Sequence, residues 1–181
     1  MTKTDSDQDL VARFCAGDRD AFAELYRRHR HGLYGYALSM CADEAHAADA
    51  TQDLWLRLIE DPARLQSARN VRAYLYGGLR NSVLDEFRRR SRERKAIEQG
   101  QPATMLVKPR DTMTSGEEAD QLDRALRRLP EEQREVVLLK IYGEMTFAEV
   151  ADVLKENAKT VESRHRLALE KLREWLSGEM A

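Results

Sequence analysis

The sequence has few of the residues that interrupt helices. Its 181 residues include only four prolines and nine glycines, and aromatic residues make up 7% of the chain. Proline and glycine are the two residues that most disfavour helix interiors, so their scarcity favours long helices. The apolar fraction of 42% is sufficient for packed cores and argues against wholesale disorder. We therefore predict an all-α fold.

Cysteine and histidine are also scarce, which excludes several kinds of site. Cys15 and Cys41 are too few and too isolated for a disulfide framework or a zinc knuckle. His29 and His31 could join Cys41 as metal ligands, but ordinary core and surface roles explain all three better. The sequence contains no glycine-rich phosphate loop, nucleophile elbow or metal cluster. We expect a binding protein without a cofactor or metal, and not an enzyme.

Long apolar runs are missing as well. Residues 1–9 are acidic and polar, unlike a signal peptide. No apolar run approaches the roughly twenty residues that span a bilayer. We therefore expect a cytoplasmic protein with no membrane insertion.

Positive charge is not in excess, because the chain has a net charge of −2 and a pI near 6.1. This average conceals local blocks. Segregated charge is typical of a protein that touches DNA on some faces and protein on others, and equally of an ordinary protein with solvated charge runs. The main basic block consists of Arg88, Arg89, Arg90, Arg92, Arg94 and Lys95.

Apolar residues recur at helical spacing in two stretches, separated by one without periodicity. The N-terminal stretch predicts helices over residues 7–16 and 20–40, between Asp43 and Pro62, and from Val71 into the basic block. The middle stretch accumulates Gly, Pro, Ser and Thr, which marks a linker. We expect the two flanking domains to move independently. The predicted division is a domain over 1–95, a flexible linker over 96–120 and a second domain over 121–181.

The second domain has the layout of a helix-turn-helix. Thr146 and Glu149 form a predicted capping box at the start of a short apolar helix. A turn over residues 155–157 follows, and it begins with Lys155 where glycine is common. Asn157 is placed to cap a second, longer helix.

The second helix of this motif has one apolar face, which Val161 marks. At roughly 100° per residue, polar donors collect on the opposite face, where they suit base edges and phosphates in a major groove. Glu162 also lies near that face, where it would repel phosphate or accept from a cytosine amine. The candidate DNA contacts on this helix are Lys159, Thr160, Ser163, Arg164 and Arg166.

Several short motifs occur along the chain in a fixed order, which is more specific than any one of them. They read DATQDLWLRL (49–58), VRAYL (71–75), LRN (79–81), RRR (88–90), LPEEQREVV (129–137), TFAEVA (146–151) and TVESR (160–164). The first resembles the polymerase-binding segment of bacterial sigma factors, the next three resemble their promoter-reading helix, and the last three resemble their fourth conserved region. With only regions two and four present, the chain is similar to the extracytoplasmic-function, or group IV, sigma factors.

This resemblance implies two helical domains and a transcription initiation factor that binds core RNA polymerase and opens promoter DNA by binding energy alone. An anti-sigma factor is a further candidate partner. The residues implied in polymerase binding are Asp49, Gln52, Asp53 and Leu56. Those implied at the downstream promoter element are Tyr74, Arg80, Asn81, Arg88 and Arg89, and the candidate contacts given above would read the upstream element.

The sequence departs from the family pattern at three places. Tyr74 stands where tryptophan is frequent, Gly77 and Gly78 are expected to interrupt the promoter-reading helix, and Glu162 replaces a common lysine. Tyr74 is equally well explained as half-buried packing, and we assign Trp55 to the core. Two other functional classes stay open. One is a repressor or activator that binds duplex DNA alone, and the other is a helical adaptor that has lost DNA binding.

Overall fold

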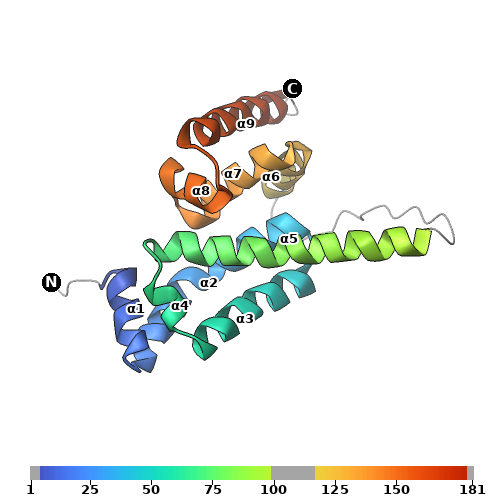
Figure 1. Cartoon of the computed structure of the whole chain (residues 1–181). Coiled ribbons are helices and arrows are strands. Elements are labelled where there is room, and N and C mark those ends of the chain that lie inside the picture. Colours follow the sequence, from blue (N-terminus) through green and yellow to red (C-terminus); the bar gives the residue numbers. More distant parts are fainter. Residues whose placement is uncertain (1–4, 99–116, 179–181) are drawn as a thin grey trace.

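The computed structural model of the chain describes residues 5–98 and 117–178, and every regular element within these ranges is a helix (Figure 1). This confirms the predicted all-α fold. The N-terminal helices are α1 (Asp7–Cys15), α2 (Arg19–Cys41), α3 (Glu44–Glu60), α4 (Ala63–Gln66) and α5 (Val71–Glu98). The C-terminal helices are α6 (Glu117–Arg128), α7 (Glu131–Gly143), α8 (Phe147–Leu154) and α9 (Ala158–Gly178).

Side-chain caps fix where the first three helices begin. Ser6 and Asp9 form a reciprocal capping box at α1. The carboxylate of Asp18 accepts from two backbone N–H groups at the start of α2, and that of Asp43 accepts from one at the start of α3. Each cap satisfies a backbone donor that the helix itself leaves free, and its loss typically costs about 1 kcal/mol.

The N-terminal domain is built around α2, α3 and α5, which pack on one another, while α1 and α4 close one end (Figure 1). The helical spacing of apolar residues that begins at Val71 is confirmed as a buried face of α5, because Val71, Leu75, Leu79 and Val83 are all buried. Trp55 is only 6% exposed, as expected for a core residue, and its ring lies edge-on to Phe22 and Tyr26.

The predicted interruption of the promoter-reading helix is wrong, because α5 continues through Gly77 and Gly78 without a break. Two glycines cost a helix roughly 1 kcal/mol each relative to alanine. The buried face that flanks them on both sides outweighs this cost. Gly78 also has a packing role, since a Cβ there would lie 3.2 Å from the Leu54 side chain of α3.

The C-terminal domain has a small core of its own between α6, α7 and α9. Its fully buried members are Ala125, Leu129, Val137, Ala168 and Leu172. The helix α7 starts after Pro130, which serves as its N-cap and has no N–H group to satisfy. Helices α8 and α9 follow as the predicted hairpin and lie against α7.

The two domains pack on each other, in contrast to the independent domains that the sequence predicts. Helix α7 lies on α2, and α8 lies on α5. One continuous apolar cluster joins Leu33 and Leu79 of the first domain to Leu138 and Val150 of the second. Periodicity shows that these residues face inward but not which element they face. The predicted linker, 96–120, lies mostly outside the described residues, since α5 runs to Glu98 and α6 begins at Glu117.

Candidate nucleic-acid and polymerase interfaces

Hydrogen bonds cap the start of each helix of the helix-turn-helix. Thr146 Oγ1 accepts from the N–H of Glu149 at 3.3 Å, and a Glu149 carboxylate oxygen accepts from the N–H of Thr146 at 2.7 Å. The hydrogen bond from the N–H of Thr146 to the Glu149 carboxylate lowers the pKa of Glu149. Asn157 Oδ1 accepts from the N–H of Thr160 at 2.8 Å. Lys155 ends α8 in the left-handed conformation, with φ at 59°. The predicted motif and both caps are therefore confirmed.

The phase predicted for α9 is also confirmed. Val161 is fully buried against the neighbouring helices, while Lys159, Ser163 and Arg166 are exposed on the other side. Arg166 pairs with Glu170 of the same helix, at 3.2 Å. Exposed pairs of this kind typically contribute about 0–1 kcal/mol. The guanidinium of Arg166 can therefore exchange this carboxylate for another acceptor at little cost.

Arg164 and Thr160 lie on the flank of α9 and are half-buried. The guanidinium of Arg164 is 2.8 Å from a carboxylate oxygen of Glu132 and 3.2 Å from one of Glu156. On the inner side of the helix, the ring of His165 lies edge-on to Phe147, and burial lowers the pKa of His165. The inner side therefore joins α9 to α8, and the outward side stays open.

Helix α5 presents its predicted DNA-binding residues less uniformly. Asn81 is exposed, and Tyr74 is half-buried against the shared apolar cluster. Arg88 pairs with Asp85 at 3.1 Å, and Arg89 pairs with Glu86 at 2.6 Å; both arginines are exposed. The side chains of residues 90–98, which complete the basic block, lie outside the described part of the structure.

Arg80 is half-buried and faces the other domain. Its Nε and Nη2 atoms donate to the two carboxylate oxygens of Glu135 in α7, at 2.6 and 3.2 Å. The hydroxyl of Tyr36 donates to the same carboxylate at 3.1 Å, and burial raises the pKa of Tyr36. The hydrogen bonds from Arg80 to Glu135 raise the pKa of Arg80. Sequence reasoning missed Glu135, and the only signal was its place directly before the apolar run that begins at Val136.

The four residues predicted to bind polymerase form an exposed stripe on α3: Asp49, Gln52, Asp53 and Leu56. Gln52 and Leu56 line a groove of about 520 Å³ between α3 and α2. Tyr26 and Ile59 add exposed apolar surface to the same groove. Asp49 and Asp53 line a separate recess toward α5, beside Arg89. The stripe therefore combines apolar surface on one side with carboxylates on the other.

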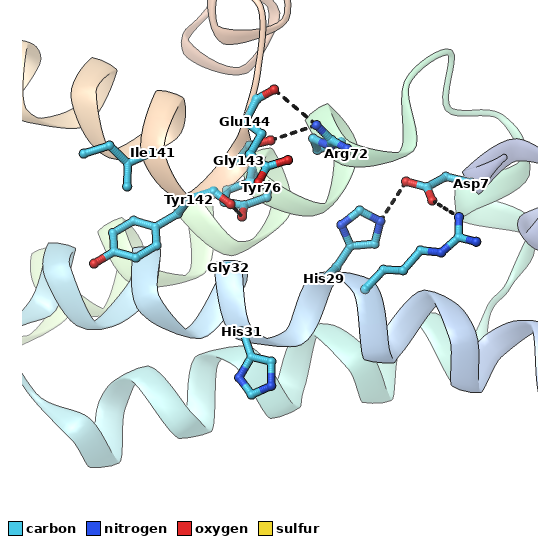
Figure 2. A pocket seen from close by; sticks show the side chains of 11 residues that line it. Asp7, His29, His31, Gly32, Arg72, Tyr76, Ile141, Tyr142, Gly143 and Glu144 are labelled. Atoms are coloured by element: carbon cyan, nitrogen blue, oxygen red, sulfur yellow. Dashed lines mark hydrogen bonds and ion pairs between the residues drawn. The ribbon is translucent and has the colours of Figure 1, made fainter. Parts of the chain in front are cut away.

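A cavity of about 550 Å³ lies between the domains, bordered by α2, α5 and the end of α7 (Figure 2). Asp7 accepts from Arg28 at 3.1 Å and is 2.7 Å from His29 Nε2, and the hydrogen bond with His29 lowers the pKa of Asp7. Figure 2 shows His31 pointing to the other side of α2 from His29. Among the side chains that the structure describes, no three His, Cys, Asp or Glu are grouped to hold a metal ion.

The comparisons with known proteins agree with both domains. Residues 25–93 match the model of Sigma-70 region 2, and residues 119–172 match that of Sigma-70 region 4. The ECF RNA polymerase sigma factor SigM of Mycobacterium tuberculosis is 32% identical over 159 residues, which cover 88% of this chain and 79% of that protein. SigK of the same species is 29% identical over 178 residues, or 94% of each chain. The chain therefore belongs to the ECF RNA polymerase sigma factors, and it is a promoter-recognising transcription initiation factor.

Two solved structures have a similar fold. CnrH, in complex with the cytosolic domain of CnrY, superposes with a TM-score of 0.69 at 27% identity, and the match covers 96% of this chain and 99% of CnrH. The sigma factor RpoE of Bartonella quintana, in complex with the anti-sigma factor NepR, gives a TM-score of 0.70 at 22% identity. The match covers 86% of this chain and 96% of RpoE.

None of the described helices combines the length and the apolar character that a membrane-spanning helix needs.

Proposed function

We propose that the chain divides promoter recognition between α9, which reads the upstream element as duplex DNA, and α5, which binds the downstream element as an opened strand. The region-two domain (1–95) would carry α5 and the polymerase-binding surface, and the region-four domain (121–181) would carry α9. The observation that carries this proposal is the exposed polar face of α9, directly opposite the buried Val161.

On α9, Lys159, Ser163 and Arg166 are the proposed contacts to base edges and phosphates in the major groove. Arginine and lysine donors match guanine acceptors, and serine bonds to several bases. Thr160 and Arg164 are the proposed phosphate contacts on the flank. On binding DNA, Arg164 would exchange the carboxylates of Glu132 and Glu156 for a phosphate, which is also negatively charged.

On α5, the proposed contacts suit an unpaired strand. Tyr74 offers an aromatic ring on which a base can stack, and Asn81 offers an amide for base edges. Arg80, Arg88 and Arg89 would neutralise phosphates. Strand separation would need no chemical step, because the binding energy of the opened form would drive it.

On α3, the stripe of Asp49, Gln52, Asp53 and Leu56 is the proposed contact with core RNA polymerase. The apolar groove beside the stripe would be buried on binding, and the carboxylates of the stripe would favour a partner surface of positive charge. Transcription initiation takes place on the chromosome, together with polymerase. The proposed function therefore requires the protein to be in the bacterial cytoplasm.

An anti-sigma factor is the proposed regulatory partner. Both structural relatives above were solved with a bound partner protein, and NepR, the partner of RpoE, is an anti-sigma factor. A partner that bridges the two domains would stabilise the packed arrangement seen here, because it would bind that arrangement and not the separated one.

The experiment that tests the proposed function is run-off transcription with core polymerase on a promoter library. We expect specific transcripts only when the chain is added. A chain that protects duplex DNA by itself and yields no transcripts would be a repressor or activator of the ordinary kind. A chain that binds neither DNA nor polymerase would be an adaptor.

A further inference from the structure

The contact between the domains involves a residue that the proposed function needs elsewhere. Arg80 is a proposed phosphate contact, yet its guanidinium is bound by the carboxylate of Glu135 through two hydrogen bonds. A carboxylate and a phosphate offer a guanidinium the same kind of paired acceptor. Glu135 therefore accepts from the same guanidinium donors that the proposed function assigns to a phosphate.

The surroundings of Glu135 favour this pairing over a solvated one. The Glu135 side chain is 7% exposed and that of Arg80 24%. Tyr36, which donates to the same carboxylate, is fully buried. Such a charge is costly to bury unless it is paired and hydrogen-bonded, so Glu135 holds Arg80 for as long as α7 stays on α2 and α5.

The end of α7, about two helical turns beyond Glu135, is also fitted closely to the first domain. Figure 2 shows Tyr142, Gly143 and Glu144 above the stretch of α2 that contains Gly32. Arg72 donates to the carbonyl oxygens of Gly143 and Glu144, at 3.1 and 3.2 Å, and Tyr76 donates to that of Tyr142. These bonds satisfy carbonyl groups that the end of a helix leaves free.

Glycine on α2 makes this close approach possible. A Cβ at Gly32 would lie 2.5 Å from the carbonyl oxygen of Tyr142 and 2.5 Å from the hydroxyl of Tyr76. One of these neighbours is backbone, so the clash cannot be relieved by a side-chain rotation alone. The domains could not keep their present distance if residue 32 carried a side chain.

We infer that the region-four domain acts as an internal inhibitor, in which Glu135 occupies Arg80 and withholds it from the opened promoter strand until α7 leaves α2 and α5. Asn81, Arg88 and Arg89 are exposed in the packed form, so that form binds the strand more weakly but still binds it. The inference rests on the proposed function of α5. It adds that strand binding is coupled to separation of the domains.

Two variants open the interface by different physical means. Glu135→Gln removes the charge that holds Arg80 while keeping the shape of the side chain. Gly32→Ala inserts a methyl group against Tyr142, and alanine is the better helix former, so α2 itself is not weakened. Gly77→Ala is the matched control for the second variant, because a Cβ there meets nothing within 4 Å.

The test measures the radius of gyration by solution X-ray scattering and the affinity for a labelled single strand of a promoter found in the transcription screen. Circular dichroism checks that each chain keeps its helicity. We expect Glu135→Gln and Gly32→Ala to enlarge the radius of gyration, while Gly77→Ala leaves it unchanged. We also expect both opening variants to bind the strand roughly tenfold more tightly, the order of one charge-assisted contact.

A further variant ties the gain to Arg80. In an Arg80→Ala background, Glu135→Gln should give no gain in strand affinity, because the residue that it releases is gone. Opening variants that stay as compact as wild type, or that expand without binding the strand more tightly, would overturn the inference. If the inference failed in this way but the wild-type chain still supported transcription by polymerase, the proposed function would stand. If no chain bound the strand, both the inference and the proposed role of α5 would fail.

Discussion

The two helices proposed to read DNA differ in how they are held. The outward face of α9 is exposed, and its Arg166 pairs with a residue of the same helix. The α5 helix lies between α2 and α3 on one side and α7 and α8 on the other, and its Arg80 is held by a residue from the other domain. One reading surface is therefore ready in the folded chain, and the other is partly occupied.

This difference suggests an order of events at a promoter. Duplex recognition by α9 requires no rearrangement of the chain. Full strand binding by α5 would require Arg80 to exchange the Glu135 carboxylate for a phosphate. The buried ion pair between Arg80 and Glu135 must be broken first, and this costs free energy. On the roles proposed for α9 and α5, recognition of the duplex and opening of the strand are therefore separate steps.

The largest effect is expected from a third surface, the proposed polymerase contact on α3, on which both proposed steps would depend. Reversing the charge of Asp53 to arginine should abolish co-purification with core polymerase, because charge reversal at a buried polar contact costs about 2–5 kcal/mol. Glu60→Arg, at the end of the same helix, is the control. Unchanged binding of the Asp53→Arg chain, measured by pull-down with helicity checked by circular dichroism, would remove α3 from the interface.

The duplex-reading side of the comparison depends on Arg166. Arg166→Ala should lower affinity for the upstream element by about 1–3 kcal/mol if the arginine makes a base contact. Arg173→Ala, which removes another exposed arginine from α9, is the control. The affinity of both variants for the upstream element is measured by electrophoretic mobility shift of the closed complex with polymerase. Normal duplex binding by Arg166→Ala would show that the reading face of α9 is assigned wrongly.

The strand-binding side depends on Tyr74. Tyr74→Ala should leave closed-complex binding intact and impair opening, since stacking is worth about 1–3 kcal/mol per base. Tyr74→Phe keeps the ring and should restore opening. Thermal unfolding separates this role from packing, because Tyr74 is half-buried. Normal opening by Tyr74→Ala would return the residue to a packing role.

The smallest effect concerns the turn that positions α9. Lys155 adopts a left-handed conformation, which costs a non-glycine residue roughly 1–2 kcal/mol. Lys155→Gly removes this cost but adds chain entropy to the unfolded state, so a net gain of about 0.5–1 kcal/mol is expected. Chemical denaturation of the whole chain measures it. A loss of stability would mean that the lysine side chain contributes more than its backbone costs.

Local patterns in the sequence predicted much of the fold. The caps at Thr146 and Asn157 and the buried face of α5 depend on residues a few positions apart, and all are present as expected. The effect of Gly77 and Gly78 was predicted wrongly, because propensity alone does not weigh the tertiary packing of α5 against α3.

The site was less accessible to sequence reasoning. The partner of Arg80 lies 55 residues further along the chain, and no periodicity links the two positions. The family resemblance implied that Arg80 contacts DNA, and so placed it on an open side of the first domain. The second domain covers that side, so an outward residue of one unit became an interface residue of the whole.

The measurement that tests promoter opening by this chain most directly is permanganate footprinting of unpaired thymines on a promoter found in the transcription screen. The samples contain the chain alone, core polymerase alone, and both together. We predict reactive thymines in the downstream element only with both proteins present. Equal reactivity with core polymerase alone, or no reactivity with both, would contradict the proposed function.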